Sequence, residues 1–349
     1  MRSSYTEDDV ILLLKDITGL VEPQPTEIRE KLIQSGKHYC EMLPIEYEPS
    51  EKYMQAYEEA MKMYSKPTAI AIGRLADQIM KERGKDVVLV SLARAGIPIG
   101  ILLKRYIRWK YEIEVYHYSI SIIRGKGIDT NAMNFLLERH RPEQLLFVDG
   151  WIGKGAILKE LKKDVAAFSG VSSELAVVAD PANVTKLCGT HDDILIPSSC
   201  LNCTVSGLIS RTFLRDDIIG TNDFHGAVFY EELETKDLSY QFIDQIQSQF
   251  ELGNDTSEEI SGSNGVEEVI NIAQKYNIKD INLIKPGIGE TTRVLLRRIP
   301  WKVLIGDKYK GDLSLQHIVR LAEEKKVPIE YIQLKNYKSC GIIKKMADT

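Results

Sequence analysis

The residues best suited to chemistry surround Asp149, where an apolar run ends in one acid and a glycine-rich turn. Four apolar residues precede Asp149, which predicts a strand covered on both faces. Gly150, Gly153 and Gly155 let backbone amides approach an anion ahead of a helix that begins near Ala156. The pattern therefore predicts a phosphate cradle and a carboxylate at the same edge of a sheet.

A second strand and turn lie upstream, where an apolar run leads to Arg94 and Gly96. In open α/β sheets, ligands gather at the carboxyl ends of the strands, so we expect Arg94 and Asp149 to face one crevice. A guanidinium suits bidentate contact with phosphate or pyrophosphate. A carboxylate beside a phosphate cradle suits ribose hydroxyls or a Mg²⁺-bound water. The basic loop at 124–129 is suited to fold over a bound polyphosphate, whereas ordinary loop-edge ion pairing remains the alternative for Arg94 and Asp149.

The elements that must position these residues alternate between strand-like and helix-like segments. Strands are predicted at 87–91, 115–123, 145–148 and 175–179, and helices at 97–110, 131–140 and 156–163. This alternation predicts an α/β fold, a parallel sheet with flanking helices, over residues 61–250. Residues 1–60 are expected to form a helical cap or hood.

A Gly-, Ser- and Asn-rich stretch at 251–265 predicts a linker. The alternation then resumes on a smaller scale and predicts a second, compact α/β/α unit over 266–349. Its helices are expected at 266–276, 291–298 and 313–324, and its strands at 281–284, 303–305 and 329–332.

Charge is distributed unevenly over a chain whose net charge is -5. Residues 285–349 hold 14 Lys and Arg against 7 Asp and Glu, a balance of +7, which leaves -12 for residues 1–284. The split suggests a polyanion partner for the C-terminal unit, with a solvated lysine-rich surface as the alternative. Five scattered cysteines fit a reducing compartment, and no segment reaches membrane length, so a cytoplasmic protein is expected.

The order of these motifs resembles the type I phosphoribosyltransferases. The resemblance implies phosphoribosyl pyrophosphate as donor, Mg²⁺ carried by that substrate rather than by protein ligands, and a base-like acceptor. It implies that Asp149 orients the ribose, while Arg94 and the loop residues Arg124 and Lys126 stabilise charge on the leaving pyrophosphate. The remaining phosphate contacts implied are Ser91, Ala93, Ala95, Gly96, Gly150, Gly153, Lys154, Gly155 and Ala156. Two departures stand out, since Gly150 replaces a second acid and Lys154 stands in a turn that usually carries hydroxyls.

Longer motifs, at 36–44, 91–100, 117–125 and 148–151, resemble the phosphoribosyltransferase-like proteins of tellurite-resistance and stress-response operons, some of which are named cysteine protease StiP. This likeness covers residues ~5 to 250. One alternative function is a catalytically silent sensor of phosphoribosyl pyrophosphate, because the second acid is missing. Another is a thiol protease, with Cys200 or Cys203 paired to His225.

The cysteines and Arg211 each allow more than one interpretation. Two ligand pairs, Cys188 with His191 and Cys200 with Cys203, could hold a structural zinc, although the strand predicted at 192–197 favours inert, buried thiols. The stretch at 204–212 is expected to start a helix, where Arg211 is either an anion contact or part of a plain N-terminal cap. No oligomeric state is fixed, and a homodimer is left open.

The C-terminal unit resembles the RNA-binding domain of Pelota and of kink-turn-binding ribosomal proteins. The matching turn follows the strand expected at 281–284 and opens a helix, and the likeness covers ~80 residues. By this resemblance the RNA contacts are Lys285, Gly287, Gly289, Glu290 and Arg293. Gly289 stands where the family has an Asn that helps read purine pairs, so general RNA affinity is expected rather than kink-turn specificity. A basic protein-interaction module is the alternative.

Overall fold

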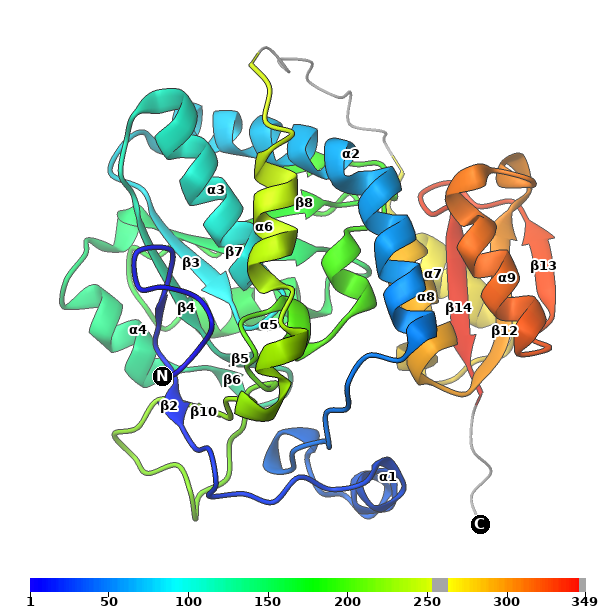
Figure 1. Ribbon diagram of the computed structural model, residues 1–349, viewed down its shortest axis with the longest axis horizontal. Helices are drawn as coiled ribbons and strands as arrows, with labels where there is room; N and C mark the ends of the chain where they lie inside the picture. Colours follow the sequence, from blue (N-terminus) through cyan, green and yellow to red (C-terminus); the bar gives the residue numbers. More distant parts are fainter. Residues whose placement is uncertain (253–262, 345–349) are drawn as a thin grey trace.

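The computed structural model describes residues 1–252 and 263–344 and shows two α/β modules packed side by side (Figure 1). The larger module is built on a six-stranded sheet in the order β1-β4-β3-β7-β8-β9, with every pairing parallel. Its strands are β1 (Ile11–Leu12), β3 (Val88–Leu92), β4 (Tyr116–Ile120), β7 (Leu145–Trp151), β8 (Leu175–Ala179) and β9 (Cys188–Thr190).

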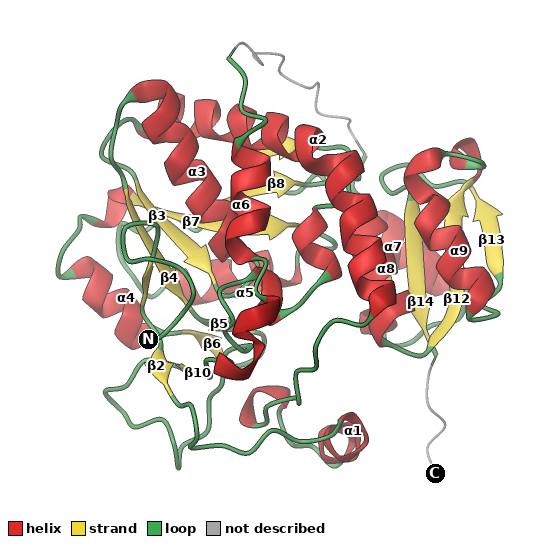
Figure 2. Ribbon diagram, viewed as in Figure 1, coloured by secondary structure: helices red, strands yellow, loops and turns green. Residues whose placement is uncertain are grey.

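Helices cover both faces of this sheet (Figure 2). On one face, Leu89 and Leu146 pack in a core with α2 (Glu51–Arg83), α3 (Gly96–Tyr111) and α6 (Ser239–Gln247). On the other, Val90 and Phe147 pack with α4 (Thr130–Leu137) and α5 (Ala156–Val165). Successive strand residues point to opposite faces, so apolar runs without alternation are what a sheet covered on both sides requires. The expected α/β sheet is therefore confirmed.

Short elements complete the larger module. They are α1 (Thr26–Gln34), the parallel pair β2 (Lys15–Asp16) and β10 (Gly226–Ala227), the hairpin β5 (Ile122–Ile123) and β6 (Gly127–Ile128), and 3-10 turns at Tyr39–Glu41, Pro142–Gln144, Pro197–Cys200, Cys203–Val205 and Glu231–Lys236.

The smaller module carries a four-stranded sheet in the order β11-β14-β12-β13, in which β14 runs antiparallel to both neighbours. Its strands are β11 (Ile284–Pro286), β12 (Pro300–Gly306), β13 (Ile329–Ile332) and β14 (Ser339–Ile343). Its helices are α7 (Gly265–Lys275), α8 (Ile288–Arg297) and α9 (Gln316–Glu324), with 3-10 turns at Ile281–Leu283, Asp307–Tyr309 and Leu313–Leu315. The linker expected at 251–265 falls mostly outside the described residues.

Six expectations about local structure were wrong. The strand expected at 281–284 is mostly a 3-10 turn ahead of β11, and residues 1–60, expected as a helical cap or hood, also supply β1 to the larger sheet. The boundary at residue 60 falls inside α2, whose N-terminal half reaches the smaller module. Residues 192–196 are irregular rather than a strand, and 204–212 start no helix. The strand predicted over 115–123 breaks at Ser121, which separates β4 from the β5 hairpin.

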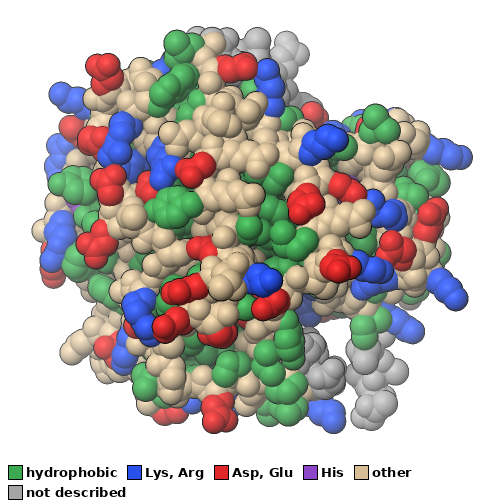
Figure 3. Space-filling model, in the orientation of Figure 1, with side chains coloured by type: hydrophobic (Ala, Val, Ile, Leu, Met, Phe, Trp, Pro, Cys, Tyr) green, Lys and Arg blue, Asp and Glu red, His purple; other side chains and the backbone are tan. Residues whose placement is uncertain are grey.

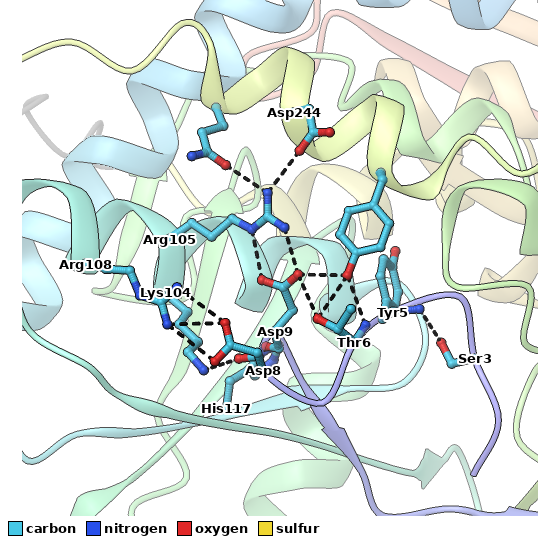
Figure 4. A network of polar contacts seen from close by, with 12 residues as sticks. Ser3, Tyr5, Thr6, Asp8, Asp9, Lys104, Arg105, Arg108, His117 and Asp244 are labelled. Atoms are coloured by element: carbon cyan, nitrogen blue, oxygen red, sulfur yellow. Dashed lines mark hydrogen bonds and ion pairs between the residues drawn. The ribbon is translucent and has the colours of Figure 1, made fainter.

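The N-terminal segment is fixed to α3 and α6 by a polar network (Figure 4). Arg105 donates to both carboxylate oxygens of Asp9, at 2.9 and 2.7 Å, and Tyr240 donates to the same carboxylate at 2.8 Å. Burial alone would raise the pKa of Asp9, but the Arg105 and Tyr240 bonds outweigh it and hold the pKa below its ordinary value. Such a bidentate, half-buried ion pair holds the N-terminal segment in one position against α3 and α6.

Among the described residues, none of the helices combines the length and apolar character that crossing a membrane would require. Charged side chains of both signs are interspersed over the face drawn in Figure 3, and Lys and Arg project from the outer rim of the smaller module.

Candidate active site

The loops after β3 and β7 meet at the carboxyl edge of the sheet. Ser91 pairs with Val148 in the parallel register, so Arg94 and Asp149 follow neighbouring strand ends. Gly96 makes this approach possible, because a Cβ there would lie 2.5 Å from the Val148 carbonyl oxygen. The Ala93–Arg94 peptide bond is cis. The structure thus places Arg94 and Asp149 after neighbouring strand ends, as the sequence predicted. The Arg94 guanidinium, however, contacts the Ile209 carbonyl and Glu46, and Arg293 is the cation whose charge acts on the Asp149 carboxylate.

Asp149 is held in an environment that disfavours its charge. Burial raises its pKa to about 7, although the Gly150 amide donates to its carboxylate at 2.7 Å and Arg293 lies close enough to oppose the shift. A carboxyl that titrates near neutrality at a strand edge is a mark of functional sites.

The glycine turn after Asp149 leads into α5 as expected, but the smaller module covers part of it. Gly155 precedes the helix with φ +77°, a conformation that favours glycine, and no side chain caps the helix amides. The Gly153 carbonyl accepts from Tyr337 at 2.7 Å, and the Lys154 ammonium donates to the Ile284 carbonyl at 3.2 Å. Burial lowers the pKa of Lys154 to about 8, helped by the neighbouring Lys285 and Arg124 charges. The glycine turn predicted to cradle a phosphate therefore lies at the interface between the two modules.

The predicted overlying loop is the tip of the β5–β6 hairpin. The Arg124 amide donates to the Tyr39 hydroxyl at 3.1 Å, and its guanidinium donates to the Asn282 side chain of the smaller module at 3.1 Å. Lys126 lies 3.8 Å from Glu41. Both cations are exposed; Arg124 bridges the hood segment and the second module, whereas Lys126 contacts the hood segment.

Behind the Arg94 loop, guanidinium groups from both modules gather around one acid. Arg94 donates to the Ile209 carbonyl at 2.8 Å and lies 3.4 Å from Glu46. Burial, followed by the charges of other arginines, lowers the pKa of Arg211 to about 10 and that of Arg297 to about 10. Arg297 comes from α8 and donates to the Cys200 carbonyl at 2.8 Å.

The turn expected to bind RNA also lies at the seam, which is the contact surface between the two modules. Asp193, from the larger module, accepts from the Ile288 amide at 2.9 Å and from the Lys338 amide at 2.8 Å, so an internal carboxylate fills the place of an external anion. A Cβ at Gly287, whose φ is +93°, would lie 3.1 Å from that carboxylate. The remaining expected RNA contacts also lie at or beside the seam: Lys285, Gly289, Glu290 and Arg293.

Glu290 and Arg293 contact the Asp149 turn through Trp151. The Arg293 guanidinium lies 6.0 Å from the Trp151 ring centre and 3.0 Å from the Glu290 carboxylate. Burial would raise the pKa of Glu290, but the Arg293 and Lys285 charges outweigh it, so the pKa lies below its ordinary value. Residues expected to contact RNA therefore line the edge of the predicted ribose-phosphate turn.

Other expected site residues lie elsewhere. Ser91 is fully buried, with its hydroxyl bonded to His117 at 2.9 Å, so it faces the core. His225 is bonded to Ser121 at 2.8 Å, whereas Cys200 points toward the backbone of α2. Burial raises the pKa of both Cys200 and Cys203 to about 12. Within the described residues there is no cluster of three or more side chains suited to a metal ion.

Several residues of the site carry no clear sequence signal. Glu46, Asn202 and Arg297 belong to three separate segments, and Glu46 accepts from Asn202 at 2.9 Å. The one usable signal was the spacing of Arg293 and Arg297, which places both on one face of a helix.

Comparisons with known proteins give the family. A family model described as "Tellurite-like stress resistance cysteine protease StiP" matches residues 3–247. The chain belongs to the StiP family. A protein named "Cysteine protease StiP" from Acinetobacter baylyi is 36% identical over 366 residues, covering 98% of this chain and 94% of the relative. A second family model, "PELOTA RNA binding domain", matches residues 263–345.

Solved structures similar to this chain include phosphoribosyltransferases. A hypoxanthine-guanine phosphoribosyltransferase from Bacillus anthracis is 18% identical with a TM-score of 0.24, covering 38% of this chain and 71% of its own. The Trypanosoma cruzi hypoxanthine phosphoribosyltransferase, in complex with the product IMP, is 18% identical with a TM-score of 0.25, covering 39% and 74%. Overall scores this low carry no argument about activity.

Proposed function

We propose that the chain is a phosphoribosyltransferase-like enzyme that binds phosphoribosyl pyrophosphate at the edge of the larger sheet and transfers ribose phosphate to a base-like or RNA-linked acceptor. The observation that carries the proposal is that Arg94, Asp149 and the uncapped N-terminus of α5 all follow the carboxyl ends of the neighbouring strands β3 and β7. This edge is where parallel α/β sheets bind phosphorylated ligands.

The transfer follows from these positions. The bond between the anomeric carbon and the pyrophosphate oxygen breaks, and its electron pair leaves with pyrophosphate. A nitrogen lone pair of the acceptor forms the new bond, and the proton of that nitrogen is released to water. Arg94 stabilises the charge on pyrophosphate, Asp149 accepts hydrogen bonds from the ribose hydroxyls, and the α5 amides hold the 5′-phosphate.

Mg²⁺ would enter with the pyrophosphate group and offset its charge. Of the carboxylates near the site, Glu46 is engaged by Arg94 and Asn202, and Glu290 by Arg293. Asp149 is the acid suited to accept a hydrogen bond from a Mg²⁺-bound water.

Calorimetry with Mg²⁺ and phosphoribosyl pyrophosphate tests this proposal. We expect saturable binding by the full chain and its loss in Asp149→Ala, with Asp86→Ala, an exposed acid, as the matched control. Absence of binding at millimolar ligand by the folded wild type would contradict it. Pyrophosphate release on adding bases or RNA separates an enzyme from a silent sensor, since a sensor binds without release.

Thiol proteolysis is a second candidate, suggested by the name of the Acinetobacter relative and by one contact. The His38 ring lies 2.9 Å from the Cys40 sulfur, and its other nitrogen lies 3.1 Å from the Arg124 carbonyl. A thiol next to an oriented histidine is the arrangement that thiol catalysis uses. Burial, however, raises the pKa of Cys40 to about 11, which opposes thiolate formation. Casein cleavage that is lost in Cys40→Ala but kept in Cys200→Ala would establish this function instead.

RNA binding by the smaller module is expected to require release of the turn from Asp193. Filter binding at low salt should therefore show stronger RNA retention for Asp193→Ala than for the wild type, because the Ile288 and Lys338 amides become available. Unchanged retention in Asp193→Ala would exclude this turn as the RNA contact.

A further inference from the structure

The arginine cluster at the seam holds more positive charge than its surroundings neutralise. Arg94 and Arg211 come from the larger module and Arg297 from α8 of the smaller one. Glu46 is the acid that the three share as a neighbour. One of its oxygens faces Arg94 at 3.4 Å and the other accepts from Asn202 at 2.9 Å. Three guanidinium groups around a single carboxylate leave an excess of about two positive charges.

Unpaired polar atoms face the same region. In the described part of the chain, the Arg297 Nε and the Tyr230 hydroxyl are buried without a hydrogen-bond partner. Tyr230 lies near Glu46 and Arg94, and burial together with the Glu46 charge raises its pKa. Buried donors are nearly always paired in native proteins, so a group of unpaired donors indicates a ligand with several acceptors.

The Arg211 guanidinium adds to this pattern. No ion pair within 4 Å reaches it from the described residues, and the charges of Arg29, Arg94 and Arg298 lower its pKa beyond the effect of burial. Arginine keeps its charge at neutral pH, so the repulsion between these guanidinium groups destabilises the folded protein unless an anion binds among them.

The position of Arg297 is fixed by contacts of α8 and α9 with the larger module. Its own guanidinium is oriented by the Cys200 carbonyl at 2.8 Å. The Tyr53 hydroxyl donates to the Leu296 carbonyl at 2.8 Å, and Arg320 binds both carboxylate oxygens of Glu59 at 2.9 Å. These bonds tie α8 and α9 to α2, so the guanidinium from the smaller module is already placed beside the Arg94 loop.

We propose that Arg94, Arg211 and Arg297 together bind the diphosphate group of the ligand, so that the smaller module supplies part of the ligand site of the larger one. The inference rests on the proposed function and deepens it, because it assigns the leaving diphosphate to three guanidinium groups from two modules. Diphosphate offers enough oxygen acceptors for the unpaired donors, and forked guanidinium groups match its geometry.

Calorimetry on the full chain tests this, with inorganic pyrophosphate and with Mg²⁺-phosphoribosyl pyrophosphate as probes. Arg297→Gln should weaken both affinities by about tenfold or more, as expected for loss of a charge-assisted bond to phosphate. Lys310→Gln, which removes the same charge from an exposed site on the same module, should bind like the wild type. Arg297→Lys should also bind more weakly, because it keeps the charge and loses the fork, and it serves if the Gln variant does not fold.

The outcomes separate the two proposals. If the wild type and Arg297→Gln bind equally and Arg94→Gln does not bind, the role of Arg297 is wrong and the proposed function stands. If the folded wild type binds neither probe, the proposed function itself is wrong. If Lys310→Gln weakens binding as much as Arg297→Gln, the effect reflects overall charge and the inference is also wrong.

Discussion

Replacing Arg211 by methionine should stabilise the protein in the absence of ligand and abolish its response to ligand. Burial and neighbouring arginines lower the pKa of Arg211 from 12.5 to about 10, so the charged group is less stable in the folded chain than in the unfolded one. At about 1.36 kcal/mol per pKa unit, the charge costs at most about 3 kcal/mol. The cost is complete at all pH values below about 10 and is relieved only above that, since the unfolded chain then binds more protons than the folded one.

Thermal unfolding measures the effect. With an unfolding entropy of about 2.1 cal/mol/K per residue, about 3 kcal/mol raises the midpoint of this chain by ~4 °C. Arg215→Met is the matched control, because the Asp217 bond raises the pKa of Arg215 and its removal should lower the midpoint or leave it unchanged. Mg²⁺-phosphoribosyl pyrophosphate should raise the midpoint of the wild type and of Arg215→Met, but not of Arg211→Met. A midpoint of Arg211→Met below that of the wild type, with the ligand response retained, would refute the reasoning.

Three further changes test other parts of the structure. Asp149→Asn should abolish pyrophosphate release. It should also stabilise the fold above pH 7 by up to about 4 kcal/mol, because burial raises the pKa of Asp149 to about 7 and the ionised carboxylate opposes folding above that pH. Equal urea midpoints for variant and wild type at pH 8 would contradict this. Asp9→Ala should cost about 1.5–3 kcal/mol, measured by urea unfolding at pH 7, because the half-buried Arg105 loses its bidentate partner and keeps only Asp244 and Gln247. A loss under 1 kcal/mol would show that the Asp9–Arg105 pair is dispensable. Cys200 and Cys203 should react with iodoacetamide at pH 8 only after denaturation, since burial raises both thiol pKa values to about 12; rapid labelling of the native chain would show that these thiols are accessible.

Most of the larger module could be predicted because its buried strands appear in the sequence as continuous apolar runs. The apolar runs that become β3, β7 and β8 are covered on both faces, and β3 and β7 each lead through a turn into a helix. β14 gave no such pattern, since Ser339, Cys340 and Gly341 are small, yet it is one of the two inner strands of the second sheet. Gly341 is needed there because a Cβ would lie 3.2 Å from the Thr291 backbone.

The seam between the modules could not be predicted from local patterns. Residues 192–196 look like a strand, but Asp193 instead reaches two backbone amides of the smaller module, and that choice depends on residues about a hundred positions away. Glu46 and Arg297 likewise acquire their roles only where distant segments meet. Local patterns singled out Arg94 and Asp149, whereas the seam where the two modules meet is a property of tertiary packing.

The proposed shared site is tested most directly by a crystal structure of the full chain with Mg²⁺ and phosphoribosyl pyrophosphate. We predict that the diphosphate lies within hydrogen-bond distance of Arg94, Arg211 and Arg297, and that the ribose hydroxyls lie against Asp149. A ligand bound elsewhere, or a diphosphate that contacts Arg94 while Arg297 stays on the Cys200 carbonyl away from the ligand, would contradict a site built from both modules.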